Sequence, residues 1–262
     1  MGYNPASDAY CQAWWRLGDD TNLVTDSSGK GNTLTNSGVV DSGTAWEGSH
    51  CGDFEAGEGD SMSRADADLS AAFPLKSGVS GDMTICCAVR FESVPGSGNY
   101  QRIIAKYQSA TGQRSFQLGV KYLTDKPVLY LILGYNSGNS ATEYNHTGRL
   151  QTDRWYHVGF TYVESTLAYR LRVWDATAGD FLAPDLTGTA SGTLHRSNEV
   201  FYLGRRYDAG YYFDGLLDDV VVFNRALSVT ELDAVRAMTF GDSPSLSVPV
   251  AAHYLNQRRR IQ

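Results

Sequence analysis

Basic charge and long apolar runs are scarce in this sequence. Its 262 residues hold 22 Lys and Arg against 29 Asp and Glu, giving a formal charge of −7 and a pI of about 5.2. This balance argues against a general nucleic-acid binder, because such proteins present a basic surface. No apolar run approaches the roughly 20 residues that span a bilayer, so no membrane segment is expected. Residues 1–10 lack the basic and apolar regions of a secretory signal, and none is predicted in the sequence as given.

Cysteine is also scarce, with four residues and no C-x-x-C pair, which makes a zinc or thioredoxin-like site improbable. Cys86 and Cys87 are adjacent in a predicted strand, so their side chains point to opposite faces and cannot pair. Cys87 shares its face with apolar neighbours and is interpreted as a buried thiol. Cys11 and Cys51 could pair if their strands are neighbours. The reduced state is the expectation, because nothing else indicates an oxidising compartment.

The residues that are plentiful favour β structure. There are 27 glycines and 16 tyrosines but only 7 prolines and 4 methionines, and short alternating runs are separated by Gly, Asn, Asp and Ser clusters. A dozen or so strands suit a two-sheet antiparallel jelly roll better than a seven-stranded immunoglobulin domain. The alternation predicts strands near 10–17, 33–40, 60–64, 82–91, 101–107, 116–120, 127–134, 158–162, 167–174, 199–204 and 211–224.

One helix is predicted late in the chain. Ser228 and Glu231 form a capping box, S-x-x-E, and Leu227 and Leu232 occupy the positions of a hydrophobic staple. These signals predict a helix over about 229–238 that ends near Gly241.

The C-terminal residues differ in charge from the rest of the chain. Asp242 and the three arginines Arg258, Arg259 and Arg260 give the chain from residue 241 onward a net charge of +2, which leaves −9 for the preceding 240 residues. We therefore expect one domain over residues 1–241 and a tail over 242–262. The tail is either a docking segment or a solvated terminus.

The segment 213–228 contains the most informative carboxylates. As an uninterrupted strand it would place Asp218 on one face and Asp219 on the other, each among apolar neighbours. A buried carboxylate needs N–H donors, an arginine or a cation. Calcium, which prefers oxygen ligands, fits an acidic protein. The alternative is that Asp218 only ties a loop through backbone N–H groups.

The sequence resembles the laminin-G-like family of concanavalin-A-like jelly rolls, which is identified by four segments in order. The stretch F-D-G-L-L-D-D-V-V-V-F-N-R-A-L-S at 213–228 is similar to the closing strand and helix start of that family, whose pattern is roughly F-D-G-x-I-D-E-V-x-I-Y-N-R-A-L-S. The other three segments are A-W-W-R-L at 13–17 with D-S-S-G-K-G-N at 26–32, D-M-T-I-C-C-A-V at 82–89 and R-W-Y-H-V at 154–158.

The resemblance implies a structural calcium ion between the opening loop and the closing strand. Its ligands would be Asp26 and Asp218, with backbone oxygens near Gly29 and Asn32. Such an ion would clamp the fold and take no part in catalysis. The alternative for the opening loop is an Asx-turn at Asp26 without metal.

Catalytic carboxylates are not evident in the sequence. Glycanases of this architecture need paired carboxylates on one strand, as in E-x-D-x-x-E, and no such trio occurs. Glu55 and Glu58 lie in a Gly-rich stretch that is interpreted as an acidic loop. A non-enzymatic protein is therefore expected, with a glycoside hydrolase as the alternative.

A binding loop is predicted between two strands near residues 205–212. It combines tyrosine rings, which stack on sugar C–H faces, with charged groups that bind hydroxyls. The alternative is that the tyrosines cover the sandwich edge while Arg205 pairs with Asp208. The candidate ligand-binding residues are Arg205, Tyr207, Asp208, Tyr211 and Tyr212.

Two functions follow from these residues. The first is a binding module of laminin-G or lectin type that recognises a glycan or a protein surface. The second is an assembly protein, such as a virion decoration or appendage subunit or another homo-oligomer, that docks through residues 243–262. Either function places the protein outside cells or on a virion surface, with no nucleic acid or membrane as partner.

Overall fold

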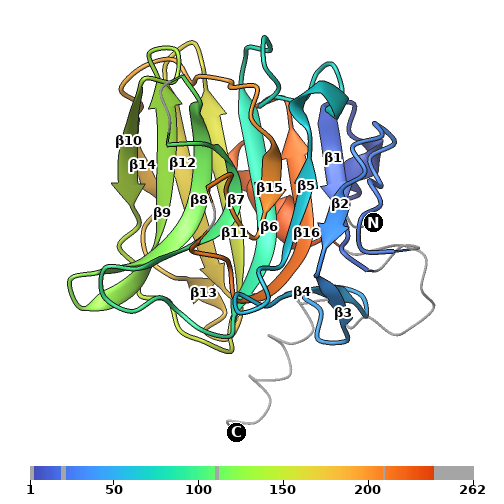
Figure 1. Cartoon of the computed structure of the whole chain (residues 1–262). Helices are drawn as coiled ribbons and strands as arrows, with labels where there is room; N and C mark the ends of the chain where they lie inside the picture. Colours follow the sequence, from blue (N-terminus) through green and yellow to red (C-terminus); the bar gives the residue numbers. More distant parts are fainter. Residues whose placement is uncertain (1–2, 19–21, 110–111, 209, 239–262) are drawn as a thin grey trace, which may run out of the picture.

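The chain folds into two antiparallel β-sheets that pack face to face (Figure 1). The computed structural model describes residues 3–18, 22–109, 112–208 and 210–238. The larger sheet has nine strands, of which seven follow one another in the order β13 (Asp180–Phe181), β12 (Ala168–Asp175), β11 (Trp155–Val163), β6 (Met83–Phe91), β16 (Gly215–Phe223), β4 (Cys51–Phe54) and β3 (Val40–Ser42). The other two are β1 (Cys11–Trp15) beside β16 and β14 (Leu186–Thr189) beside β12.

The smaller sheet has seven strands and lies across the core from the first. Of the two 3-10 helices, Pro5–Ser7 precedes β1 and Asp66–Asp68 lies between β5 and β6. The strand order is β10 (Ser140–Asn145), β9 (Lys126–Tyr135), β8 (Arg114–Leu123), β7 (Tyr100–Tyr107), β15 (Phe201–Leu203), β5 (Ser61–Arg64) and β2 (Thr35–Ser37). The jelly-roll sandwich predicted from the sequence is confirmed.

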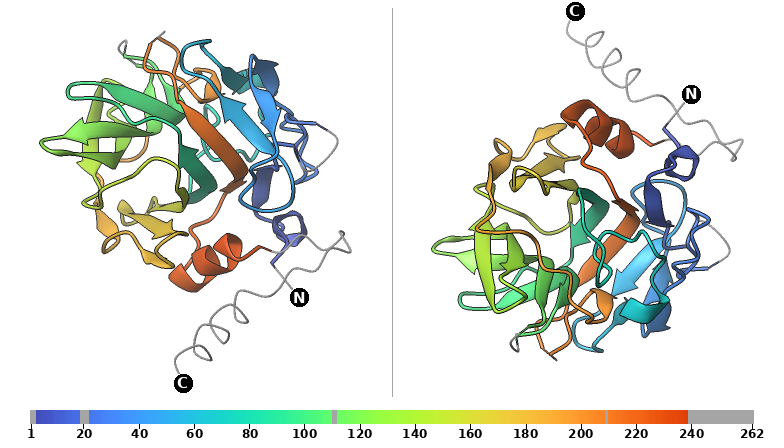
Figure 2. Two further views of the ribbon diagram at one scale, coloured as in Figure 1. Left: turned by 90° about the horizontal axis from the view of Figure 1, so that it is seen from below. Right: turned by 90° about the horizontal axis from the view of Figure 1, so that it is seen from above.

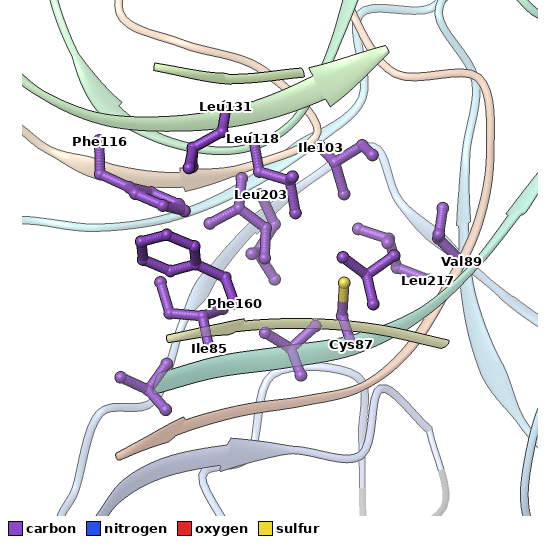
Figure 3. Close-up of a cluster of buried hydrophobic side chains, with 14 of the residues drawn as sticks. Ile85, Cys87, Val89, Ile103, Phe116, Leu118, Leu131, Phe160, Leu203 and Leu217 are labelled. Carbon is purple, nitrogen blue, oxygen red and sulfur yellow. The ribbon is translucent and has the colours of Figure 1, made fainter. Parts of the chain in front are cut away.

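Alternation along the strands builds the main core. In β12, buried residues alternate with partly exposed ones, so Tyr169, Leu171 and Val173 face inward. Phe116 of the smaller sheet meets Phe160 of the larger one with ring centroids 5.2 Å apart. Figure 3 shows such side chains from both sheets filling the space between them.

A second core lies on the outer face of the nine-stranded sheet, under the helix α1 (Val229–Arg236) (Figure 2). Gly159 of β11 permits the close approach, because a Cβ there would lie 3.0 Å from Cδ2 of Leu232. The capping box between Ser228 and Glu231 is present. The helix begins at the predicted residue and ends two residues earlier than predicted.

All four cysteines are buried and unpaired. Cys86 belongs to the core under α1 and Cys87 to the core between the sheets, as expected for neighbours in a strand. The Cys11 thiol donates to Ala13 O and the Cys51 thiol to Thr44 O, so no disulfide joins them.

The sequence prediction failed at a few strands. The short strands β4, β10, β13 and β14 were not expected, the predicted strand 33–40 falls partly in β2 and partly in β3, and residues 211–214 are not in a strand. The predicted tail, 242–262, lies outside the described residues, as does the helix stop near Gly241. Within the described ranges, no helix is long and apolar enough to cross a membrane.

Candidate functional site

Asp26 holds the opening loop against β1. Its Oδ1 accepts hydrogen bonds from the backbone N–H groups of Trp14 and Ser28, both at 3.0 Å, and its Oδ2 accepts one from Asn32 N–H at 2.7 Å. The bond to Ser28 is the predicted Asx-turn. Gly29 turns the chain with a φ of 76°, which favours glycine.

Asn32 completes this loop and is fully buried. Its side-chain amide donates to Gln12 O at 2.6 Å, and its side-chain oxygen accepts from Ser70 N–H at 2.8 Å. Its backbone oxygen accepts from the indole N–H of Trp15 at 2.7 Å. Both of its oxygens therefore already accept protein hydrogen bonds.

A β-bulge places Asp218 and Asp219 in β16. The pairing of β16 with β6 shifts between Asp218 and Val221, and Asp219 has a φ of 45°. This irregularity corrects the uninterrupted alternation expected from the sequence. Leu217 and Val220 both face the main core, although strict alternation would put them on opposite faces.

The two aspartates bind separate parts of the structure. Asp218 Oδ2 accepts from the N–H groups of Trp46 and Glu47 at 2.9 and 3.3 Å. Asp219 Oδ1 accepts from the indole N–H of Trp14 at 2.9 Å. Both carboxylates are buried, as at least one had to be, and both receive N–H donors.

These contacts test the calcium ligands that the family resemblance implied. Asp26 bonds to β1 and to its own loop, whereas Asp218 bonds to residues 46–47. A calcium ion needs oxygen lone pairs that point into a shared space, but N–H groups face the oxygens of Asp26 and Asn32. The protein hydrogen bonds to Asp26, Asn32 and Asp218 are therefore in place without an ion, and the proposed ligand set of Asp26, Gly29, Asn32 and Asp218 stays an expectation of the family resemblance. The geometry favours loop ties through N–H groups, and calcium binding stays a prediction.

The predicted binding loop exposes two tyrosines. Tyr207 and Tyr211 are 47% and 46% exposed, and only two other large apolar side chains among the described residues are comparably exposed. Tyr212 lies against Gly59 of the acidic loop, where a Cβ would be 3.5 Å from its ring. The loop therefore presents aromatic rings to solvent, which is what stacking on a ligand requires.

Arginines hold the loop in shape. The Arg205 guanidinium lies 4.7 Å from the ring centre of Tyr202 and donates to the carbonyl oxygens of Arg206 and Tyr207 at 3.0 and 3.2 Å. Asp208 accepts from Arg206 at 2.6 Å and from Ser109 at 2.8 Å. The Arg205–Asp208 pair of the alternative interpretation is therefore wrong, because the partner of Asp208 is Arg206.

Tyr211 stands over a buried arginine that sequence reasoning missed. Arg102 of β7 is 4% exposed, and its guanidinium lies 4.7, 5.6 and 5.0 Å from the ring centres of Tyr100, Tyr130 and Tyr211. Burial lowers the pKa of Arg102. Its backbone N–H donates to Tyr211 O at 3.0 Å, so the loop is anchored to β7 at Tyr211.

An acidic edge adjoins this loop. Carboxylate oxygens of Asp53, Glu55 and Glu92 lie within 4.8 Å of one another. Burial and then the neighbouring carboxylates, Asp214 among them, raise the pKa of each. Asp214, two residues after the binding loop, is joined to the acidic loop because its Oδ1 accepts from Ala56 N–H at 3.3 Å. Such carboxylates can accept hydroxyl hydrogens from a ligand.

Strand pairing explains why sequence reasoning missed part of this site. The predicted strands 101–107 and 127–134 contained Arg102 and Tyr130, and alternation alone could have put both on polar faces. Their meeting depends on β8 lying between them, with Gly119 opposite both residues. That register is a long-range property which a single sequence does not reveal.

Comparisons with known proteins agree with this architecture. None of the curated proteins matches the sequence significantly. Domain 4 of AbnA, a GH43 extracellular arabinanase from Geobacillus stearothermophilus solved in complex with arabinotriose, superposes with a TM-score of 0.58 at 13% identity, covering 88% of this chain and 100% of that one.

Two further solved structures are similar. The binding domain of Paraclostridial Mosquitocidal Protein 1 has a TM-score of 0.65 at 14% identity over 89% of this chain and 53% of that one. The enzymatically active domain of tailspike protein 2 from bacteriophage CBA120 has a TM-score of 0.55 at 12% identity over 77% of this chain and 29% of that one. At these identities the likeness shows the fold alone, which binding domains and an enzyme domain share.

The family itself is shown by a sequence match. A laminin G family model, described as the concanavalin A-like lectin/glucanases superfamily, matches residues 64–233. That span includes most strands of both sheets and the start of α1. The chain therefore belongs to the concanavalin A-like lectin/glucanases superfamily.

Proposed function

We propose that the protein is a non-enzymatic binding module that recognises carbohydrate through the loop 205–212. The observation that carries the proposal is the exposure of Tyr207 and Tyr211 on a loop that arginines hold in place. Exposed rings on a fixed backbone lose little conformational entropy when a ligand stacks on them. The arabinanase domain solved with arabinotriose shares this fold, which supports a sugar ligand.

Several features of the site support binding without catalysis. The carboxylates of Glu55 and Glu92 are exposed, whereas a general acid works best in a water-excluded site. The buried histidines are held neutral, since burial lowers the pKa of His157 to about 3 and of His146 to about 4. Neither is therefore a protonated acid near neutral pH.

A glycan screen tests the proposal with a matched control. We expect Tyr207→Ala and Tyr211→Ala each to weaken binding about tenfold, because stacking of one tyrosine ring on a sugar contributes on the order of 1.4 kcal/mol. Tyr10→Ala is the control, since Tyr10 is 54% exposed and belongs to the N-terminal segment. The proposal for the loop would be wrong if both loop variants bound glycans as tightly as the wild type, or if Tyr10→Ala lost as much affinity as they do.

Assembly is the second candidate function, and the likeness to a phage tailspike domain favours it. Under this proposal residues 243–262, which lie outside the described residues, dock the domain onto a particle or another copy. Deleting 243–262 should abolish oligomer formation or particle incorporation while the melting temperature stays unchanged. A variant that assembles normally would remove the assembly proposal and leave glycan binding untouched.

A further inference from the structure

A hollow lies on the outer face of the nine-stranded sheet and belongs to a different surface from the loop 205–212. It is open to solvent, measures about 590 Å³ and lies between β12 and the connection from β13 to β14. Its lining comprises Arg170, Arg172, Phe181, Ala183, Pro184, Asp185 and Thr187. Neither the glycan-loop proposal nor the family match concerns these residues in particular.

A carboxylate fixed by two arginines forms its polar wall. Arg172 Nη1 donates to both oxygens of Asp185 at 3.0 Å, and Arg170 donates to Oδ2 of the same carboxylate. Asp185 is largely buried, whereas the Arg170 side chain is 35% exposed. A carboxylate oxygen has two acceptor positions, and Oδ1 receives only one of these donors. The wall therefore holds an acceptor beside the remaining N–H donors of Arg170.

The opposite wall is apolar. The Phe181 ring has the Arg172 guanidinium 3.7 Å from its centre and the edge of Trp174 at a centroid distance of 4.9 Å. Pro184 is exposed next to it. These contacts hold the Phe181 ring, so the hollow has an apolar part beside its polar wall before any ligand arrives.

A separate small cavity lies beside the hollow, under α1. Arg172 and Phe181 also line a small cavity of about 10 Å³ beneath the helix, together with His157. That volume holds about one water molecule, and the Nε2 atom of His157, a residue 6% exposed, has no protein partner. This cavity is thus a polar, water-sized space, and a sugar would occupy only the larger hollow.

Both arginines that line the hollow are already paired with carboxylates, and this pairing argues for a neutral ligand. Asp185 and Asp233 both pair with Arg172, and Asp185 also pairs with Arg170. An anion would have to compete with these fixed carboxylates for the same guanidinium groups. Two neighbouring hydroxyl groups of a sugar, by contrast, supply a donor for the carboxylate and an acceptor for Arg170.

We propose that this hollow is a second carbohydrate site, in which Asp185 and Arg170 bind vicinal hydroxyl groups of a neutral sugar ring while Phe181 and Pro184 contact its apolar face. An acceptor and a donor beside an aromatic wall are the groups that orient a sugar in a protein site. Thr187 supplies a further hydroxyl at the open side. The site does not depend on the loop 205–212.

Saturation-transfer NMR on the full chain tests this site with methyl glycosides of arabinose, glucose, galactose and mannose as probes. At least one glycoside should receive saturation from the wild type, and both Arg170→Gln and Phe181→Leu should bind it about tenfold more weakly, as expected for loss of one charge-assisted hydrogen bond or one ring contact. Arg170→Gln keeps the Asp185–Arg172 pair, so the fold should persist, which the melting temperature checks.

The double variant Tyr207→Ala, Tyr211→Ala is the matched control and should keep the Arg170-dependent signal, even if the loop proves not to bind glycans. The proposal is overturned if no probe receives saturation, or if Arg170→Gln and Phe181→Leu both bind as the wild type does. Tighter binding of glucuronate than of methyl glucoside would also overturn it, because it would identify an anion site.

Discussion

Asp26 is a single residue on which a whole loop depends. Its carboxylate satisfies the backbone N–H groups of Trp14, Ser28 and Asn32, and two of these bonds are fully buried. A buried donor without a partner costs about 1–3 kcal/mol. The residue therefore stabilises the junction of β1 with the opening loop through these hydrogen bonds.

Replacing this carboxylate should destabilise the fold measurably. We expect Asp26→Ala to lower the free energy of unfolding by about 3 kcal/mol, because two buried N–H groups lose their acceptor. Urea unfolding measures the change. Asp125→Ala is the control, since Asp125 is 71% exposed and its contact with Arg149 spans 3.4 Å, and an exposed pair contributes about 0–1 kcal/mol. Equal losses in the two variants would contradict this account.

The Asp26→Ala variant also tests whether calcium stabilises the protein. Since N–H groups already occupy its oxygens, we expect the difference in melting temperature between wild type and Asp26→Ala to be the same in calcium and after a chelator. A bound ion would stabilise the wild type alone through ligand linkage. A calcium-dependent rise in the wild-type melting temperature that Asp26→Ala lacks would restore the clamp that the family resemblance implied.

The helix α1 packs closely on the strand β11 beneath it. Leu232 packs over Gly159, leaving no room for a side chain on β11 at that position. The helix buries Leu232 and Val235 in the core that β1, β6 and β16 share. A glycine in mid-strand thus reflects a helix packed against the sheet.

A side chain at this glycine should loosen the helix. We expect Gly159→Val to cost about 1–3 kcal/mol through overpacking against Leu232. In the Gly159→Val background, Leu232→Ala should then cost less than it does in the wild type, because it relieves the clash. A double-mutant cycle by urea unfolding measures this coupling, and strictly additive losses would show that the two positions do not interact.

Stability of the whole molecule should depend on pH through its buried histidines. Burial lowers the pKa of His146 to about 4 and of His157 to about 3, while an unfolded histidine titrates near pH 6.5. Between these values the unfolded state binds more protons, so stability is complete above about pH 6.5 and is lost as the pH falls. At pH 5 each histidine should lower the free energy of unfolding by about 2 kcal/mol relative to neutral pH.

The acidic edge acts in the opposite direction. The pKa values of Asp53, Glu55 and Glu92 are raised, so protonation in the carboxyl range relieves their repulsion and partly offsets the loss. The double variant His146→Gln, His157→Gln should flatten the pH dependence between pH 7 and pH 5. Unfolding curves across that range measure the slope, and an unchanged slope would assign it to other groups.

The sequence predicted the sandwich because alternation is a local property. Tyr169, Leu171 and Val173 had to share a face of their strand whatever they packed against. The capping box likewise identified the start of α1 from Ser228 and Glu231 alone. The loop 205–212 could be recognised from its aromatic and charged composition. That composition predicted an exposed loop but did not reveal which residues it contacts.

Only the tertiary structure decided how distant segments meet. The bulge at Asp218 and Asp219 interrupts an alternation that the sequence predicted as continuous. It lies where the neighbour of β16 changes, since β4 pairs with β16 before the bulge and β1 pairs with β16 after it. The placement of Tyr211 over Arg102 and the convergence of Arg170 and Arg172 on Asp185 also depend on strand register and loop packing. Local pattern determined the apolar faces of the regular strands, whereas long-range pairing determined which polar groups are buried and which of them meet.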